Sequence, residues 1–294
     1  MHYYKNCPVC KSETFNSFLD CKDYTVSKET FSIVSCKACG FKFTNPIPEP
    51  TNLGNYYKSE DYISHSNTKK GLISQLYHLV RNYTLKQKLK LVANHVSRGT
   101  VLDYGCGTGM FLNTCQNAGW EAYGMEPDSG ARKIAEEMQI RVFGDKNELI
   151  LNLGPTKLNA ITLWHVLEHV TDLPETLHFF KEQLSKEGVL IIAVPNHQSY
   201  DAQFYGKFWA AYDVPRHLYH FDKDSMERLL GSYGFKLIET KPMKFDSFYV
   251  SMLSEKYKTG SISYFKAFYI GLVSNLKARA SGNYSSLIYV FKHK

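Results

Sequence analysis

The sequence predicts an α/β protein in which a doubly wound, seven-stranded sheet, its last strand antiparallel, follows a small cysteine-containing N-terminal module. Three observations predict this class. From residue 100 onward, short apolar runs alternate with amphipathic stretches, which is typical of a parallel sheet covered by helices on both faces. A glycine-rich turn follows the first of these runs. Two closely spaced cysteine pairs lie before residue 45.

The strands are predicted from seven short runs rich in β-branched and aromatic residues. They are TVLDYG (100–105), EAYGME (121–126), IRVFG (140–144), LNAITLW (158–164), GVLIIAVP (188–195), FKLIETKPM (235–243) and SSLIYVFKHK (285–294). Helical spacing of apolar residues predicts helices over 71–96, 109–118, 129–139, 172–186 and 222–234. Asp222 is placed to cap the last of these, and Gly234 to end it. A helical insertion is expected over about 246–283, between the last two strands.

The cysteine pairs near the N-terminus are Cys7-x2-Cys10 and Cys36-x2-Cys39. Each pair can place two thiolates on one tetrahedral ion, so the two pairs together complete a closed four-sulfur zinc site. Because no coordination position stays open, this Zn²⁺ should be structural. We expect a zinc ribbon over 1–45, a proline-containing linker over 46–70 and the main domain over 71–294.

The chain has a formal net charge of +7, and its C-terminal part carries this excess. From Lys241 to Lys294 there are nine Lys or Arg against two acids. Such a segment could face an acidic substrate, a nucleic acid or a lipid surface, or be a solvated helix face. We find no signal peptide and no apolar run long enough to span a membrane, so the cytoplasm is the expected compartment.

The glycine-rich turn has the sequence VLDYGCGTGMF, with Gly105, Gly107 and Gly109 between the first strand and its helix. Glycines there let the backbone turn sharply and approach a ligand closely. The G-x-G-x-G spacing differs from the G-x-G-x-x-G of dinucleotide-binding proteins, and no Gly-Lys-Ser/Thr follows. Glu126 ends the second strand, where a carboxylate can accept both hydroxyls of a ribose, and Asp145 follows the third.

This pattern resembles the first motifs of class I S-adenosylmethionine-dependent methyltransferases, which have a Rossmann-like sheet. The resemblance implies S-adenosylmethionine as cofactor, S-adenosylhomocysteine as product, and a role for Asp103 in orienting the ammonium end or the loop. It implies that Glu126 binds the ribose and Asp145 the adenine amine. The cofactor-binding residues that it implies are Asp103, Tyr104, Gly105, Cys106, Gly107, Gly109, Glu126, Pro127, Asp145, Trp164 and His165.

The stretch LWHVLEHV contains His165-x-x-Glu168-His169, which matches the signature of one class of zinc peptidases. A strand leads directly into His165, so the single helix that those peptidases use for both histidines is not predicted. The stretch also resembles the LEHV segment of ubiquinone-biosynthesis O-methyltransferases, some of which hold a divalent cation with a Glu in place of His165. His169 is expected either to take part in catalysis or to lock the loop.

A second group lies in YGKFWAAYDVPRHLYHF, residues 205–221. It resembles the PRHLYHF segment of a bacterial methyltransferase group with an N-terminal four-cysteine ribbon, several of which are encoded with surface-polysaccharide enzymes. Arg216 could bind an anionic acceptor group, and His217 or His220 could take a proton. Alternatively, a salt bridge of Arg216 and packed aromatic rings pin the loop.

The function expected from these features is methyl transfer to a small polar acceptor, at a hydroxyl of a sugar, a sugar nucleotide or a related metabolite. The candidate catalytic residues are His165, His169, Arg216, His217 and His220. An RNA methyltransferase, a sugar C-methyltransferase and a non-enzymatic scaffold remain alternatives. Apolar residues at helical spacing in the insertion, from Phe265 to Leu276, would cap the pocket, rest on a membrane or pack on the domain. The oligomeric state stays open.

Overall fold

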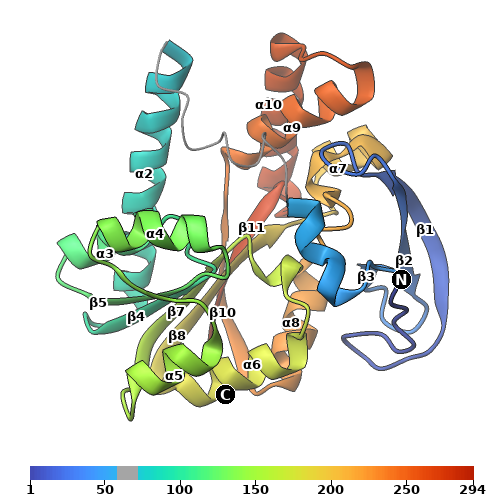
Figure 1. Ribbon diagram of the computed structural model, residues 1–294. Helices are drawn as coiled ribbons and strands as arrows, with labels where there is room; N and C mark the ends of the chain where they lie inside the picture. The colour runs from blue at the N-terminus through green and yellow to red at the C-terminus, as the bar shows by residue number, and fades with distance from the viewer. Residues whose placement is uncertain (58–71) are drawn as a thin grey trace.

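The computed structural model describes residues 1–57 and 72–294 and shows a large sheet between two helical layers, with a smaller sheet beside it (Figure 1). The large sheet has the strand order β10-β11-β8-β7-β4-β5-β6. Its strands are β4 (Thr100–Tyr104), β5 (Glu121–Met125), β6 (Arg141–Phe143), β7 (Leu158–Trp164), β8 (Leu184–Pro195), β10 (Phe235–Pro242) and β11 (Ser286–His293).

The direction of the strands confirms the predicted class. β4 pairs in parallel with β5 and β7, and β7 does so with β8. The last strand, β11, is antiparallel to both β8 and β10. Every residue of β4 is buried, as expected for a central strand covered on both faces. Asp103 pairs in register with Gly124 on one side and Thr162 on the other, so three neighbouring strands end at one edge.

Two buried clusters fill the two faces of this sheet. One takes side chains from α5 (Lys146–Leu153), α6 (Leu173–Gln183) and α8 (Lys223–Ser232). The other takes them from α2 (Leu72–His95), α3 (Met110–Asn117) and α4 (Ser129–Glu137). Asp128, Asp145, Asp172 and Asp222 cap the starts of α4, α5, α6 and α8 by accepting backbone N–H groups. The helix α5 was not predicted from the sequence.

The smaller sheet combines the N-terminal segment with a strand from far along the chain. Its order is β1 (Phe15–Lys22), β2 (Thr30–Cys36), β3 (Lys42–Thr44) and β9 (Tyr219–His220). β9 belongs to the PRHLYHF stretch and pairs antiparallel with β3. Phe41 and Phe43 join the same buried cluster as Phe221, so the zinc-ribbon segment shares a core with the main domain.

The linker and the C-terminal insertion add a 3₁₀ helix and a pair of α-helices to this core. Residues 58–70 of the expected linker lie outside the described part, while its beginning forms the 3₁₀ helix η1 (Pro50–Tyr57). The insertion between the last two strands consists of α9 (Asp246–Thr259) and α10 (Tyr264–Ser281), packed on α7 (Tyr200–Tyr205). None of the described helices combines the length and the apolar character that a bilayer crossing requires.

Candidate functional site

The glycine turn after β4 adopts a backbone that only glycine accommodates easily. Gly105, Gly107 and Gly109 have φ angles of 74°, 54° and 75°. A Cβ on Gly105 or Gly109 would lie 2.6 Å from Val166 or 2.8 Å from Ala135, so these two glycines also permit close packing. A Cβ on Gly107 would meet no described atom within 4 Å. The turn is therefore open at Gly107, where a ligand could approach the backbone.

The three acids of the predicted cofactor site lie at successive strand ends. Asp103 is buried and accepts a hydrogen bond of 2.6 Å from Thr162 Oγ1, and burial raises the pKa of its carboxyl to about 7. Glu126 accepts from the backbone N–H of Gly107 at 2.9 Å, which joins the second strand end to the glycine turn. Asp145 accepts two N–H groups at the start of α5 through Oδ1 alone.

The side chains of three other predicted cofactor residues are not directed toward a ligand at the carboxyl edge of the sheet. Tyr104 is buried with its ring against Phe180, at a centroid distance of 5.0 Å. Cys106 is buried in the cluster on the opposite face of the sheet. Pro127 is exposed, and its carbonyl accepts a hydrogen bond from Arg132. The side chains of Tyr104 and Cys106 serve packing, so only their backbones could contact a ligand.

A lysine that the sequence reasoning did not find reaches this site from α2. Lys88 Nζ lies 4.3 Å from the ring centroid of Trp164, and burial lowers the pKa of this lysine while the charges of Asp103 and Asp246 oppose that shift. Trp164 Nε1 is buried and has no hydrogen-bond partner among the described residues. A buried, unsatisfied donor at the end of β7, the strand that neighbours β4, fits a bound ligand.

His165 lies between two carboxylates. Its Nε2 is 3.0 Å from Asp246 Oδ2, at the start of α9, and its Nδ1 is 3.4 Å from Glu168 Oε1. Burial alone would lower the pKa of His165, but the hydrogen bond with Asp246 and the negative charges of Asp246 and Glu168 raise it to about 10. This ring is therefore an imidazolium at neutral pH. It also has a φ of 59°, an uncommon left-handed conformation for a residue other than glycine.

Glu168 is the most deeply buried acid near this edge of the sheet, with an exposed fraction of 0%. Neither of its oxygens has a hydrogen-bond partner among the described residues, since the contact with His165 is an ion pair without hydrogen-bond alignment. Burial would raise the pKa of Glu168, but His165, His217 and His169 lower it. The group is thus a buried carboxylate whose lone pairs are available to a ligand.

Two histidines from different segments face this carboxylate. His169 Nδ1 lies 3.0 Å from the carbonyl oxygen of Arg216, and His217 Nδ1 lies 2.8 Å from that of Ala211. A carbonyl can only accept, so Nδ1 of each ring carries a proton, and in the neutral form of each ring Nε2 is the acceptor. Glu168, His169 and His217 each offer a ligand atom, and these atoms all lie within 4.8 Å of one another. The group could hold a proton or a cation.

The surroundings of His169 make its ring difficult to protonate. His169 is in edge-to-face contact with His217, at a centroid distance of 4.5 Å. Burial and the charge of His217 lower the pKa of His169 to about 4. Its Nδ1 also lies 3.0 Å from the hydroxyl of Tyr57, the last residue of η1. Tyr57 lies within the segment expected to be a linker, and no motif in the sequence indicated this contact.

The side chains of Arg216 and His220 have partners other than Glu168 and the two histidines that face it. All five N–H groups of Arg216 donate within the protein, to the carboxylates of Asp23 and Asp213 and to the carbonyl of Tyr56. No N–H group of Arg216 is therefore left for an anionic acceptor, and the expectation that Arg216 binds one is wrong. The contacts agree with the alternative interpretation, in which Arg216 fixes the conformation of the loop. His220 is buried in β9, with Nε2 3.1 Å from Thr44 Oγ1 in the smaller sheet. Its environment is an interface between segments, where burial holds its pKa well below the ordinary value.

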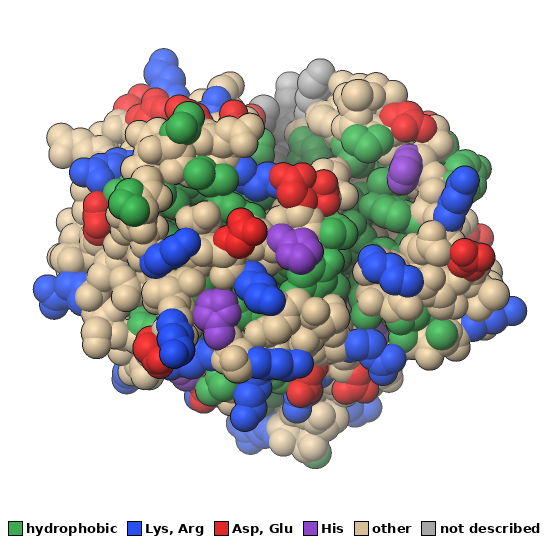
Figure 2. All heavy atoms as spheres, turned by 90° about the horizontal axis from the view of Figure 1, so that it is seen from below, with side chains coloured by type: hydrophobic (Ala, Val, Ile, Leu, Met, Phe, Trp, Pro, Cys, Tyr) green, Lys and Arg blue, Asp and Glu red, His purple; other side chains and the backbone are tan. Residues whose placement is uncertain are grey.

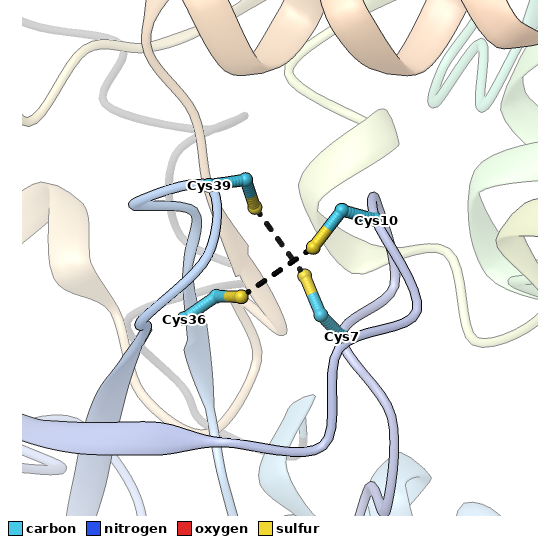
Figure 3. A group of neighbouring side chains, drawn as sticks. All are labelled: Cys7, Cys10, Cys36 and Cys39. Atoms are coloured by element: carbon cyan, nitrogen blue, oxygen red, sulfur yellow. Dashed lines mark hydrogen bonds between the residues drawn. The ribbon is translucent and has the colours of Figure 1, made fainter.

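The four N-terminal cysteines converge as the sequence predicted (Figure 3). Cys7 Sγ lies 3.7 Å from Cys39 Sγ, and Cys10 Sγ lies 3.5 Å from Cys36 Sγ. Tetrahedral zinc with bonds of about 2.3 Å places its sulfurs about 3.8 Å apart. Two tight turns support the pairs, in which Lys11 and Gly40 donate to the carbonyls of Cys7 and Cys36. The donor set and its geometry fit a structural zinc ion.

Comparison with known sequences identifies relatives for the main domain. A family model described as a methyltransferase domain matches residues 77–240, more than half of the chain. The ubiquinone biosynthesis O-methyltransferase of Azorhizobium caulinodans is 27% identical over 159 residues, covering 50% of this chain and 62% of that protein. An uncharacterized methyltransferase of Bacillus cereus is 32% identical over 100 residues, covering 33% of this chain and 47% of that protein. The chain thus matches less than two thirds of each relative.

Comparison with solved structures shows the same fold. The magnesium protoporphyrin IX methyltransferase of Synechocystis PCC 6803 with bound S-adenosylhomocysteine has a TM-score of 0.54 and 14% identity, covering 84% of this chain and 100% of that chain. The same enzyme with bound S-adenosylmethionine has a TM-score of 0.51 and 15% identity, covering 85% and 100%. At this level of identity the similarity concerns the fold alone.

Proposed function

The chain belongs to the methyltransferase-domain family, and on that premise we propose that it transfers the methyl group of S-adenosylmethionine to a hydroxyl of a small polar acceptor. The buried carboxylate of Glu168, which faces the rings of His169 and His217 and has no hydrogen-bond partner among the described residues, is the observation that carries this proposal. Methylation of a hydroxyl releases a proton, and this group offers a place to receive it.

The cofactor would lie along the carboxyl edge of β4, β5 and β7. The open side of Gly107 supports an approach of the methionine moiety to the turn, and Glu126, held by the Gly107 N–H, has lone pairs left for ribose hydroxyls. Asp145 would use its second oxygen for the adenine amine. The unsatisfied Nε1 of Trp164 is a further donor at this edge, in the residue that ends β7 and precedes His165.

Methyl transfer from a sulfonium is an in-line displacement, so positioning and exclusion of water supply most of the catalysis. In the step proposed here, the acceptor oxygen forms its bond to the methyl carbon as the carbon–sulfur bond breaks. The hydroxyl proton passes to Nε2 of His217, and S-adenosylhomocysteine leaves. The carboxylate of Glu168 stabilises the imidazolium that forms on His217.

The other histidines take different parts in this proposal. His165 is already protonated between Asp246 and Glu168, so it supplies positive charge rather than a base. His169 holds a proton poorly, because its pKa is lowered to about 4, and its contacts with Arg216 and Tyr57 fix the position of the loop. His217 therefore remains as the proton acceptor.

A sugar, a sugar nucleotide or a related metabolite is the acceptor that we favour. The O-methyltransferase from Azorhizobium caulinodans supports transfer to oxygen, because its match spans half of this chain. Sugar C-methylation and RNA methylation are the alternatives. On the face drawn in Figure 2, Lys and Arg are interspersed with Asp and Glu, whereas a surface that tracks nucleic acid gathers its cations in a continuous stripe.

The test is transfer of labelled methyl groups from S-adenosylmethionine into an extract of cells that lack the gene, with and without prior ribonuclease treatment. Label that survives ribonuclease in a small or glycan-linked product supports the proposal, and its release as methyl iodide in hot hydriodic acid, which cleaves O-methyl ethers but leaves C-methyl groups in place, would locate the acceptor atom. Label that disappears with the RNA would replace it with the RNA alternative. S-adenosylhomocysteine binding without any transfer would indicate a scaffold.

A further inference from the structure

We propose that the outward face of α10 docks on an anionic lipid surface. The relevant side chains form one stripe along the helix and consist of Phe265, Phe268, Tyr269, Leu272 and Leu276. Each of them is exposed by 40% or more, and Phe265 is exposed by 86%. Their spacing of three and four residues puts them on a single side. We call these five residues the α10 stripe.

The side of α10 opposite the α10 stripe is the one that packs against the protein, so the stripe is not needed for the core. The buried residues of that inner side are mostly small, namely Ala267, Gly271, Ser274 and Ala278, together with Ile270. A Cβ on Gly271 would lie 2.8 Å from the ring of Phe248 on α9, so the two helices are in close contact. A helix that is apolar on its outer side as well as its inner side requires a second apolar or interfacial environment.

The charges around the stripe indicate what this environment is. From Asp246 to Ser281 the chain has five Lys or Arg against two acids, a net charge of +3. Both acids are engaged inside the protein, Asp246 with His165 and the buried Glu255 with Lys266. Lys258, Lys277 and Arg279 are exposed. Large apolar side chains bordered by cations are typical of helices that lie in the headgroup region of anionic membranes.

A second copy of this chain is a poorer occupant of the same surface. A twofold contact places the same patch on both partners, so two segments of net charge +3 would face each other. An anionic bilayer has the opposite charge and also accepts the aromatic rings at its interface. The charge of the surface therefore favours lipid over self-association.

The stripe is connected to the candidate active site through aromatic contacts. Phe268 stacks on Phe248 of α9 at a centroid distance of 5.2 Å. Phe245, next to Asp246, packs edge-to-face on Tyr83 of α2, and Figure 1 shows α2 and the α9–α10 pair rising from the same side of the molecule. Resting on the proposed function, this arrangement indicates an acceptor carried by a lipid, which a docked enzyme would meet at the membrane surface.

The test is sedimentation of the full chain with vesicles of phosphatidylcholine containing 30% phosphatidylglycerol (about one lipid in three anionic), against vesicles of phosphatidylcholine alone. We expect binding to the anionic vesicles that weakens with added salt. The double variant Phe265→Ser/Leu272→Ser should lower the apparent affinity at least about tenfold, because two large apolar side chains no longer enter the interface. Leu151→Ser, which removes a leucine that is exposed by 83% on α5 and lies outside the α10 stripe, is the control and should bind as the wild type does.

Affinity for S-adenosylhomocysteine, measured in parallel, shows that each variant is folded and tests the methyltransferase assignment separately. Equal vesicle binding by the double variant and the wild type would overturn the proposal. Absence of binding of the wild type to the anionic vesicles would also overturn it. If, in addition, the wild type forms a dimer and the double variant does not, the α10 stripe is a contact between copies of the chain.

Discussion

His165 and Asp246, which are 81 residues apart in the sequence, form a contact of 3.0 Å at the carboxyl edge of the sheet. The contact joins the end of the strand β7 to the first residue of α9. It converts a histidine that resembled a general base into a cation and ties the C-terminal helical pair to the candidate active site.

The stability that His165 contributes should depend on pH. Its pKa is raised from 6.5 to about 10 in the folded protein, so its stabilisation is complete below about pH 6.5 and disappears as the pH rises through 10. The difference in unfolding free energy between wild type and His165→Gln, measured by urea denaturation, should therefore be largest at acidic pH and shrink from pH 6.5 to 10. A difference that grows with pH would show that the ring is neutral in the native state.

Gly107→Val should weaken S-adenosylhomocysteine binding about 10- to 100-fold, because the side chain would occupy space next to the turn that the ligand needs. The matched control is Gly154→Val, which has the same φ of 54° and an equally open surrounding but lies at the end of α5. Both variants place a β-branched side chain at the same positive φ, so calorimetric titration separates the effect of this unfavourable φ from loss of the site. Equal affinities would remove the cofactor assignment.

Glu168→Gln should lower kcat about 100-fold or more while affinity for S-adenosylhomocysteine stays within about twofold. The amide keeps the size of the side chain but removes the charge that would stabilise an imidazolium on His217. Glu175→Gln, at an exposed position in the first turn of α6, serves as the control and should retain full turnover. Full activity of Glu168→Gln would return this acid to a purely structural role.

Arg216→Ala should destabilise the fold by about 3–5 kcal/mol, since it leaves the carboxylates of Asp23 and Asp213 without their cation. The Arg216 side chain is 3% exposed, so water cannot easily replace the lost contacts. Chemical denaturation of this variant is best compared with Arg228→Ala, which removes an exposed arginine from α8. Similar small losses for both would mean that the buried ion pairs contribute little.

Cys36→Ser should abolish stoichiometric zinc binding and lower the unfolding free energy by at least ~2 kcal/mol, because a serine hydroxyl does not replace a thiolate ligand. Metal content by elemental analysis and a thermal scan give the two readouts. Cys21→Ala, a buried cysteine outside the cluster, should keep one zinc per chain. A Cys36→Ser protein that retains its zinc would exclude the four-sulfur site.

Much of the fold followed from the sequence because its signals are local. Alternation of apolar runs and the glycine spacing predicted the seven strands, and the cysteine spacing predicted the converging sulfurs. The helix α5 was not predicted because it is short and because its capping residue, Asp145, was interpreted only as a cofactor contact. The contacts of Lys88, Tyr57 and Asp246 could not be predicted, because each depends on how segments far apart in the chain pack together.

The pairing of β3 with β9 sets a limit on how the molecule can be divided. Removing the first 45 residues to obtain a minimal enzyme would strip β9 of its neighbour and Arg216 of Asp23, leaving an unpaired strand edge and an unbalanced charge beside the loop that holds His217. Such a truncated protein should aggregate or lose its loop geometry even though every residue matched by the family model is still present. The smallest autonomous unit therefore includes the cysteine-bearing segment.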